Sequence, residues 1–157
     1  MIRAALVLCG LVAGVQPAHA LSCLRRDIAQ TFADLGAAPE TYVIARGTST
    51  LDDGEVVRPG YVEDAEDYDL AARFQGHVLT PDGPGEAVDS HLTVEVRCAG
   101  PWCGAPPEDA SVLFLETRDG ALYFTANACP GNAFAATPEI EARATACLRG
   151  EGCEPEG

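Results

Sequence analysis

Cysteine is the residue type that most narrows what this chain of 157 residues can fold into. Of its seven cysteines, Cys9 lies in an N-terminal apolar segment and the other six lie between positions 23 and 153. Six cysteines in an exported chain of this size indicate three disulfides, for which 15 pairings exist. A structural zinc site is a poorer interpretation, because paired CxxC motifs are missing and His77 and His91 lie outside the cysteine clusters.

The N-terminus has the organisation of a secretory signal peptide. Arg3 precedes an apolar run over residues 4–15, and Ala18-His19-Ala20 places small residues at positions −3 and −1 of a cleavage site. The run is too short for a membrane-spanning helix, which needs ~20 apolar residues. The alternatives are a retained anchor and lipidation of Cys23, which Ala20 disfavours because a lipobox has a larger aliphatic residue there. We expect residues 1–20 to be removed and the product to be periplasmic or extracellular.

The remaining residues, 21–157, have a length typical of one domain and contain no further apolar segment that could cross a membrane. The chain carries a formal net charge of −14, and all ten of its basic side chains are arginine. Such a field repels phosphate backbones and anionic lipid, so nucleic acid and membrane surfaces are not expected partners. We interpret the charge as a source of solubility for a monomer, with a basic partner or a cation as alternatives.

Hydrophobic spacing predicts one helix before and one helix after a β-rich centre. The first helix is predicted from four apolar residues at helical spacing: Leu24, Ile28, Phe32 and Leu35. Gly36 and Pro39 end it. The second helix is predicted over Pro138–Arg149, with Thr137 as its N-cap and Gly150 as its stop signal.

Five short strands are predicted between the helices, over residues 41–46, 72–78, 91–97, 112–118 and 121–127. Asp119-Gly120, between the last two strands, is a strong signal for a tight hairpin. The connections are predicted as an acidic loop over residues 51–69, a turn region over 80–90 and a Cys- and Pro-rich loop over 98–109. This order favours a small barrel or an α+β sandwich, mostly β with flanking helices.

No catalytic motif stands out in the sequence. GxSxG, HExxH and phosphate-loop motifs are absent. Asp89-Ser90-His91 cannot form a catalytic triad, because consecutive residues of a strand point to opposite faces. We therefore predict no catalytic residue and no cofactor, and we do not expect an enzyme.

His77, His91 and the acidic loop are the candidates for a metal site. The two histidines flank the connection between two predicted strands, but the sequence suggests no third ligand. The acidic residues of the loop do not follow the spacing of an EF-hand. We interpret these residues as solvated surface, and no metal ligand is predicted; a metal-binding protein or an enzyme that uses them is an alternative.

A longer pattern resembles a known family. Cys103-Gly104 opens a loop, residues 112–115 and 122–125 form an apolar hairpin, and Cys129 closes the segment. This resembles the second half of the netrin module, the OB-fold barrel shared with tissue inhibitors of metalloproteinases and their bacterial relatives. Leu21-Ser22-Cys23, the helix after it and residues 41–47 resemble the start of the bacterial members. The resemblance implies a five-stranded OB-fold-like barrel with an N-terminal and a C-terminal helix over residues 21–157, ending in a short acidic tail.

The resemblance also implies a disulfide pairing. Cys23 corresponds to the second family cysteine, whose partner follows the last strand and is therefore Cys129. Leu21 takes the place of the first family cysteine, so Cys103 loses its family partner and most simply pairs with Cys98. This leaves Cys147 with Cys153; only the Cys23–Cys129 pair rests on the family itself.

In the protease inhibitors of this family, the mature N-terminal residue chelates the zinc of the enzyme. The resemblance therefore suggests a partner-binding edge formed by Leu21, Ser22, Cys23 and Trp102, although Trp102 could instead pack against the Cys98–Cys103 loop. Leu21 lacks the anchoring disulfide of the family, so ordering it costs entropy that binding must offset. We predict an exported, non-enzymatic binding module of the cell envelope, with an unknown protein or ligand as partner and metalloproteinase inhibition as the first alternative.

Overall fold

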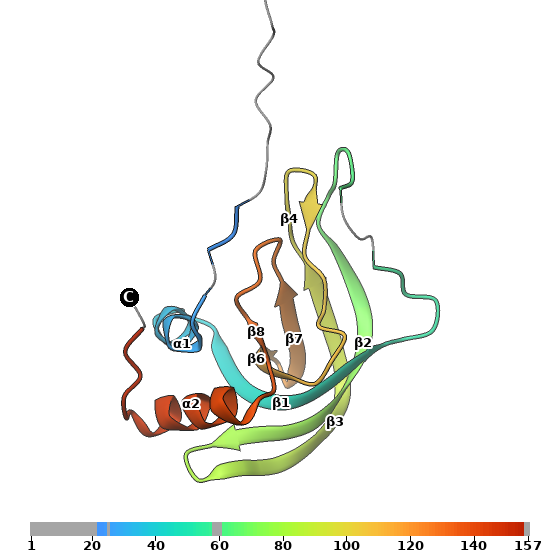
Figure 1. Cartoon of the computed structure of the whole chain (residues 1–157). Coiled ribbons are helices and arrows are strands. Elements are labelled where there is room, and N and C mark those ends of the chain that lie inside the picture. The colour runs from blue at the N-terminus through green and yellow to red at the C-terminus, as the bar shows by residue number, and fades with distance from the viewer. Residues whose placement is uncertain (1–21, 25, 58–60, 156–157) are drawn as a thin grey trace, which may run out of the picture.

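The structure, a computed structural model, describes residues 22–24, 26–57 and 61–155. The predicted signal peptide and Leu21 lie outside the described residues. In chain order the elements are α1 (Ile28–Gly36), β1 (Thr41–Leu51), β2 (Tyr68–Thr80), β3 (Gly83–Val96), β4 (Cys98–Ala99), β5 (Trp102–Cys103), β6 (Ser111–Arg118), β7 (Ala121–Ala126), β8 (Ala133–Ala135) and α2 (Pro138–Arg149) (Figure 1).

The main sheet closes into a five-stranded barrel. Its strands follow the order β1-β2-β3-β7-β6, and pairing of β1 with β6 closes the circle. The β3–β7 pair is parallel and the other pairs are antiparallel. The short strand β8 adds to β6 outside the circle. The chain is therefore a mostly β, OB-fold-like barrel with one N-terminal and one C-terminal helix, which confirms the predicted fold class.

Two apolar cores hold the barrel and its helices together. The first fills the barrel interior around Phe74, which is fully buried, with residues such as Val94 and Leu115. The second lies on the outer face of β1 and β6, where Ile44 and Phe114 pack against α1 and α2. This division follows from strand geometry, because alternate residues of β1 and β6 point to opposite faces. Residues 111–116 of β6 are therefore buried on both faces, whereas the outer face of β1 is buried at Ile44 and exposed at Arg46 and Thr48.

The β1–β2 pair requires glycine where its two backbones come close. A Cβ atom on Gly76 would lie 2.1 Å from the carbonyl oxygen of Arg46, and one on Gly47 would lie 2.2 Å from the carbonyl oxygen of Gln75. Real Cβ atoms do not approach backbone oxygens this closely. These two glycines therefore allow the strands to close the barrel.

The second helix matches its prediction and the first is shorter than expected. The Thr137 side chain accepts a hydrogen bond from the amide of Ile140, and Gly150 ends α2 in the left-handed conformation. Helix α1 begins at Ile28, because the Asp27 side chain caps it by accepting a hydrogen bond from the amide of Ala29. Leu24 lies before this cap and is 89% exposed. Its inclusion in the predicted helix, which rested on its apolar spacing, was therefore wrong.

The predicted turn region over residues 80–90 is wrong. Only Pro81 and Asp82 lie between β2 and β3, and Gly83 starts β3 with a φ of 113°. Strand β7 pairs with β3 only from Leu92 onward, so the first half of β3 has one open edge. A strand edge accommodates proline, which explains how Pro84 lies within the strand.

The other two predicted loops are present, but their bounds or contents differ from the prediction. Strand β1 extends to Leu51 and β2 begins at Tyr68, so the acidic loop between them is shorter than expected. The Cys- and Pro-rich loop contains the small hairpin β4–β5. Strand β8 was not predicted.

Three disulfides cross-link the fold: Cys23–Cys129, Cys98–Cys103 and Cys147–Cys153. All three are the predicted pairs, of which Cys23–Cys129 is the one that the family resemblance itself implies. Three disulfides are consistent with an oxidising environment and with export. Among the described residues, no helix is long and apolar enough to span a membrane.

Candidate functional site

One end of the barrel gathers most of the irregular chain. Strand β1 ends there, β2 begins there, and β3 and β7 both end there. The loops at this end are the described parts of residues 52–67, the β4–β5 hairpin and residues 127–132; Figure 1 shows the hairpin with β4 at the top of the view. We call it the disulfide end, because Cys23–Cys129 and Cys98–Cys103 both lie there.

The two disulfides of this end lie on either side of the end of β7. The amide of Arg97, just before Cys98, donates a hydrogen bond of 2.9 Å to the carbonyl oxygen of Ala126. Cys129 follows three residues later and bonds to Cys23. A Cβ atom on Gly104, just after Cys103, would lie 2.0 Å from the same Ala126 oxygen, so only glycine lets the hairpin approach. The N-terminal segment and the hairpin are thus both fixed to the end of one strand.

The hairpin presents the sole tryptophan of the chain, Trp102, which contacts Tyr61 of the acidic loop. Their ring centroids lie 5.7 Å apart in an edge-to-face arrangement, and the two residues form an isolated β-bridge. The amide of Val62 also donates a 2.9 Å hydrogen bond to the carbonyl oxygen of Pro101. Trp102 is half-buried, whereas Tyr61 is 66% exposed. The acidic loop therefore holds an aromatic ring at the surface.

The predicted binding edge is only partly described. Leu21 lies outside the described residues, while Ser22 and Cys23 are exposed. Trp102 belongs to the same end of the barrel, and its ring contact is with Tyr61, a residue that the sequence did not single out. The sequence signal for Tyr61 is an aromatic residue in an otherwise acidic, irregular stretch.

Acidic side chains lie beside Tyr61. Tyr61 lines a hollow with Glu63, Asp64, Gly100 and Pro101. Asp64 is held at a positive φ of 54°, which is uncommon for a residue other than glycine. The exposed acidic side chains of this region therefore place negative charge next to an aromatic surface.

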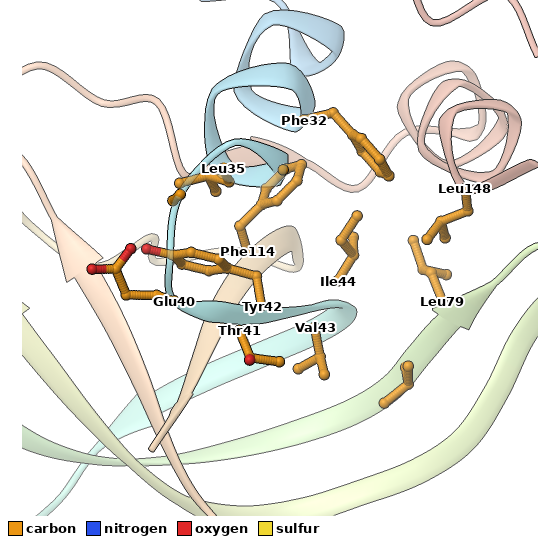
Figure 2. Close-up of a pocket in the computed structure, with 13 residues that line it drawn as sticks. Phe32, Leu35, Glu40, Thr41, Tyr42, Val43, Ile44, Leu79, Phe114 and Leu148 are labelled. Atoms are coloured by element: carbon orange, nitrogen blue, oxygen red, sulfur yellow. The ribbon is translucent and has the colours of Figure 1, made fainter. Parts of the chain in front are cut away.

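A second hollow lies between the helices and the barrel (Figure 2). Its volume is about 460 Å³, and α1, β1, β2, β6 and α2 all contribute to its lining. Most of the lining side chains are aliphatic or aromatic. Glu40, Thr41 and Tyr42 provide polar atoms.

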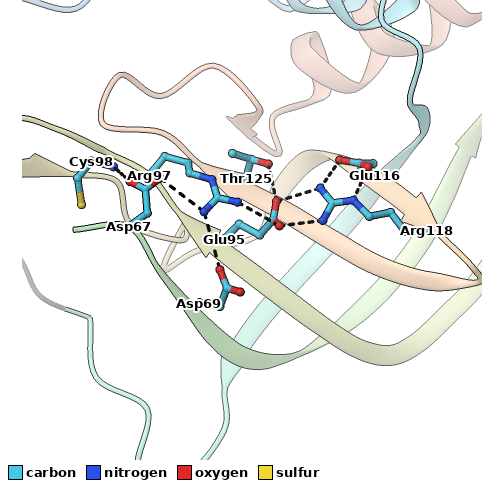
Figure 3. Close-up of polar contacts among 8 residues, drawn as sticks. All are labelled: Asp67, Asp69, Glu95, Arg97, Cys98, Glu116, Arg118 and Thr125. Atoms are coloured by element: carbon cyan, nitrogen blue, oxygen red, sulfur yellow. Dashed lines mark hydrogen bonds and ion pairs between the residues drawn. The ribbon is translucent and has the colours of Figure 1, made fainter.

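A network of charged residues covers the outer face of β3, β6 and β7 (Figure 3). Arg118 donates hydrogen bonds to both carboxylate oxygens of Glu95, at 2.8 and 3.1 Å, and to both carboxylate oxygens of Glu116. Its guanidinium also lies 4.2 Å from the centroid of the Tyr123 ring. These contacts join three strands of the barrel through one side chain.

The network extends from the barrel wall to the disulfide end. Arg97 lies 3.1 Å from Glu95 and 3.7 Å from Asp67, and Asp67 accepts a 2.7 Å hydrogen bond from the amide of Cys98. The hydrogen bonds from Arg118 hold the pKa of Glu95 below its ordinary value, and the carboxylates of Glu116 and Glu95 raise the pKa of Arg118. Both groups are thus held in their charged forms, which suits a structural network better than proton transfer.

The two histidines do not lie opposite each other. His77 pairs with Ala87 in the sheet, and His91 pairs with Arg73. Arg73 and His77 are four positions apart on β2, which is about 13 Å at ~3.3 Å per residue. Within the described residues, no group of three His, Cys, Asp or Glu side chains could hold a metal ion.

The chain is a disulfide-bonded, OB-fold-like barrel protein with an aromatic and acidic surface at one end. No protein-family model, no curated protein and no solved structure matches it. Membership of the netrin-module family therefore stays a prediction, and the function is inferred from the geometry of this surface.

Proposed function

We propose that the mature protein is an exported, non-enzymatic binding module of the cell envelope, and that it binds a protein partner through the disulfide end. The observation that carries this proposal is the Tyr61–Trp102 pair, in which Tyr61 of the acidic loop, a residue that is 66% exposed, is held against Trp102 of the cross-linked hairpin. Aromatic side chains in rigid surroundings supply much of the binding energy of protein interfaces. An aromatic ring at the surface leaves apolar area in contact with water, which solvation of an acidic loop does not require.

The charge around the pair favours a basic partner. Glu63 and Asp64 lie beside Tyr61, and the chain as a whole carries a net charge of −14. Complementary charge accelerates association and orients the partner, while the aromatic rings give a face for cations. A protein surface that presents arginine or lysine next to apolar residues fits both features. The same charge opposes nucleic acid.

The pairing of the charged residues supports a binding role over a catalytic one. Arg118 and Arg97 each form an ion pair with Glu95. Catalytic acids and bases need a site where a substrate can reach them and a pKa near the working pH. The hydrogen bonds of Glu95 instead favour its carboxylate form. The network therefore fits a role in holding the barrel and its hairpin together.

Site-specific photo-crosslinking in the producing cells tests the proposal. Benzoylphenylalanine would replace Tyr61 in one variant and Ala142, an exposed residue of α2, in a matched control. The proposal predicts a discrete protein adduct on irradiation from position 61, lost when Trp102→Ala is added, and no such adduct from position 142. Equal adducts from both positions, or none from position 61, would overturn it.

Inhibition of a zinc protease through the mature N-terminus is the alternative function. Ser22 and Cys23 are exposed and Cys23 is fixed to Cys129, which would hold the preceding residue near the disulfide end. However, Cys103 is bonded to Cys98 rather than to the N-terminus. The binding module is therefore the preferred proposal.

A further inference from the structure

The hollow between the helices and the barrel is a separate candidate for a ligand site. Its floor is formed by Ile44 of β1 and Leu79 of β2, and its walls by Phe32 and Leu35 of α1 and Leu148 of α2 (Figure 2). Its volume of about 460 Å³ falls in the range of ~300–1,000 Å³ typical of small-molecule sites. The proposed protein-binding surface at the disulfide end does not use it.

The hollow exists because two helices share one apolar face without covering it completely. Ile44 and Leu79 are buried under α1 and α2, but Leu35 and Leu148 at the walls are only half-buried. Water therefore contacts several aliphatic and aromatic side chains at once. Removing such apolar surface from water is favourable, so an apolar molecule gains by filling the space.

One side of the hollow is polar and carries negative charge. Figure 2 shows the Tyr42 hydroxyl and the Glu40 carboxylate on the same side of the site. Burial raises the pKa of Tyr42, and the nearby carboxylates of Glu116 and Glu40 raise it further, while Arg118, which is paired with Glu116 and Glu95, acts in the opposite direction. The net direction is upward, so the phenol keeps its proton. None of the 13 lining residues is basic.

We propose that this hollow binds a small amphiphile with an apolar tail and a single cationic head. The tail would lie between Phe32, Ile44 and Leu79, and the head would lie beside Glu40 with the Tyr42 hydroxyl as a hydrogen-bond acceptor. A molecule with a carboxylate head would meet the Glu40 carboxylate and the overall charge of −14 without any basic residue of the lining to offset them.

Competition between matched ligands tests the proposal on the whole mature protein. The neutral dye N-phenyl-1-naphthylamine reports occupation of an apolar site by its fluorescence, and decylammonium and decanoate, both below micelle-forming concentrations, compete for it. We expect decylammonium to displace the dye at about tenfold lower concentration than decanoate. The ammonium group is attracted to the exposed carboxylate of Glu40 and the carboxylate group of decanoate is repelled by it, and these two effects together account for the difference. Glu40→Gln should reduce this preference severalfold while tail binding persists.

Two tryptophan variants separate the hollow from the general charge of the protein. Leu35→Trp fills the site without changing any charge and should abolish displacement by decylammonium. Val56→Trp makes a comparable substitution at a residue that is 70% exposed in the acidic loop, and it should bind like the parent. Thermal unfolding of both variants identifies a loss of binding that comes from a loss of folding.

Several results would overturn the proposal. These are equal displacement by decanoate and decylammonium, unchanged binding in a folded Leu35→Trp variant, or no dye binding by the parent. A concentration-dependent dimer that Leu35→Trp disrupts would instead assign the hollow to a second copy of the chain. None of these results bears on crosslinking at position 61, so the two proposals fail independently.

Discussion

Trp102 and Tyr61 lie edge to face, with ring centroids 5.7 Å apart, and they join the cross-linked hairpin to the acidic loop. Such a pair contributes about 0.5–1.5 kcal/mol beyond the apolar area that it buries. It also fixes the position of a ring that would otherwise move with its loop. The contact is therefore the structural basis of the proposed binding surface.

Removing Tyr61 should expose Trp102. Because Trp102 is the sole tryptophan, the tryptophan fluorescence of the protein reports the environment of this one residue. We expect Tyr61→Ala to shift the emission to longer wavelength and to weaken binding of the partner, while the free energy of unfolding falls by only about 1 kcal/mol. Val56→Ala, in the same loop, is the control and should leave the emission unchanged. An unshifted spectrum in Tyr61→Ala would show that the rings do not pack in solution.

Glu95 should make the stability of the barrel depend on pH. Its hydrogen bonds with Arg118 hold its pKa below the ordinary value of 4.5, so the folded state favours the carboxylate. This contribution is present above pH 4.5 and is lost as the pH falls through the lower pKa of the folded state. Glu95→Gln should therefore lower the free energy of unfolding by about 1.5–3 kcal/mol at pH 7, and by much less near pH 3.

Urea unfolding at the two pH values measures this difference. Glu86→Gln, at an exposed position of β3, provides the matched control and should change the free energy of unfolding little at either pH. The structural account of the network would be wrong if Glu95→Gln and Glu86→Gln had the same effect at pH 7.

The long-range disulfide should stabilise the fold more than the short one. Cys23 and Cys129 are separated by 106 residues and Cys147 and Cys153 by 6. On the chain-entropy model, the first should contribute about 4–5 kcal/mol and the second about 2 kcal/mol. Double Cys→Ser variants of each pair, compared by denaturant unfolding, measure the two values. Equal losses would contradict the entropic account.

Gly76 should not tolerate a side chain. A Cβ atom there would lie 2.1 Å from the carbonyl oxygen of Arg46, so the two strands would have to separate. We expect Gly76→Ala to lower the free energy of unfolding by about 1–3 kcal/mol or more. Gly36→Ala provides the comparison, because a Cβ atom on Gly36 would meet no other atom within 4 Å and helix α1 favours alanine. A stable Gly76→Ala variant would mean that the strands are farther apart.

The two proposed functions differ in the effect of the mature protein on the activity of a zinc protease. Residue 21 is leucine, which cannot form a disulfide, and Cys103 of the hairpin is bonded to Cys98. We expect the mature protein to leave zinc proteases active. Inhibition that disappears when one residue is added before Leu21 would instead establish the alternative function.

Local signals predicted much of this fold. The proline, caps and glycine stop of α2 and the Asp119-Gly120 hairpin each depend on a few neighbouring residues, and the structure has both. The disulfide pairs came from a family resemblance combined with the small number of cysteines left over. Such features need no knowledge of distant contacts.

Other features depend on tertiary structure and were missed. Pro84 lies in a strand because β7 leaves that edge of β3 open, which the sequence of β3 alone does not reveal. The three residues of β8 are too few to show a strand pattern. Tyr61 is placed in the proposed binding surface by its contact with Trp102, far along the chain, and the hollow beside Glu40 arises from the placement of two helices.

The central claim is that the exported chain is a barrel cross-linked by three disulfides, with its N-terminal segment fixed to the disulfide end. Intact-mass and peptide mapping of the unreduced protein from its native compartment tests this most directly. The account predicts a mature chain that starts at Leu21 and contains Cys23–Cys129, Cys98–Cys103 and Cys147–Cys153. Free thiols at these positions, or a bond between Cys23 and Cys103, would contradict it.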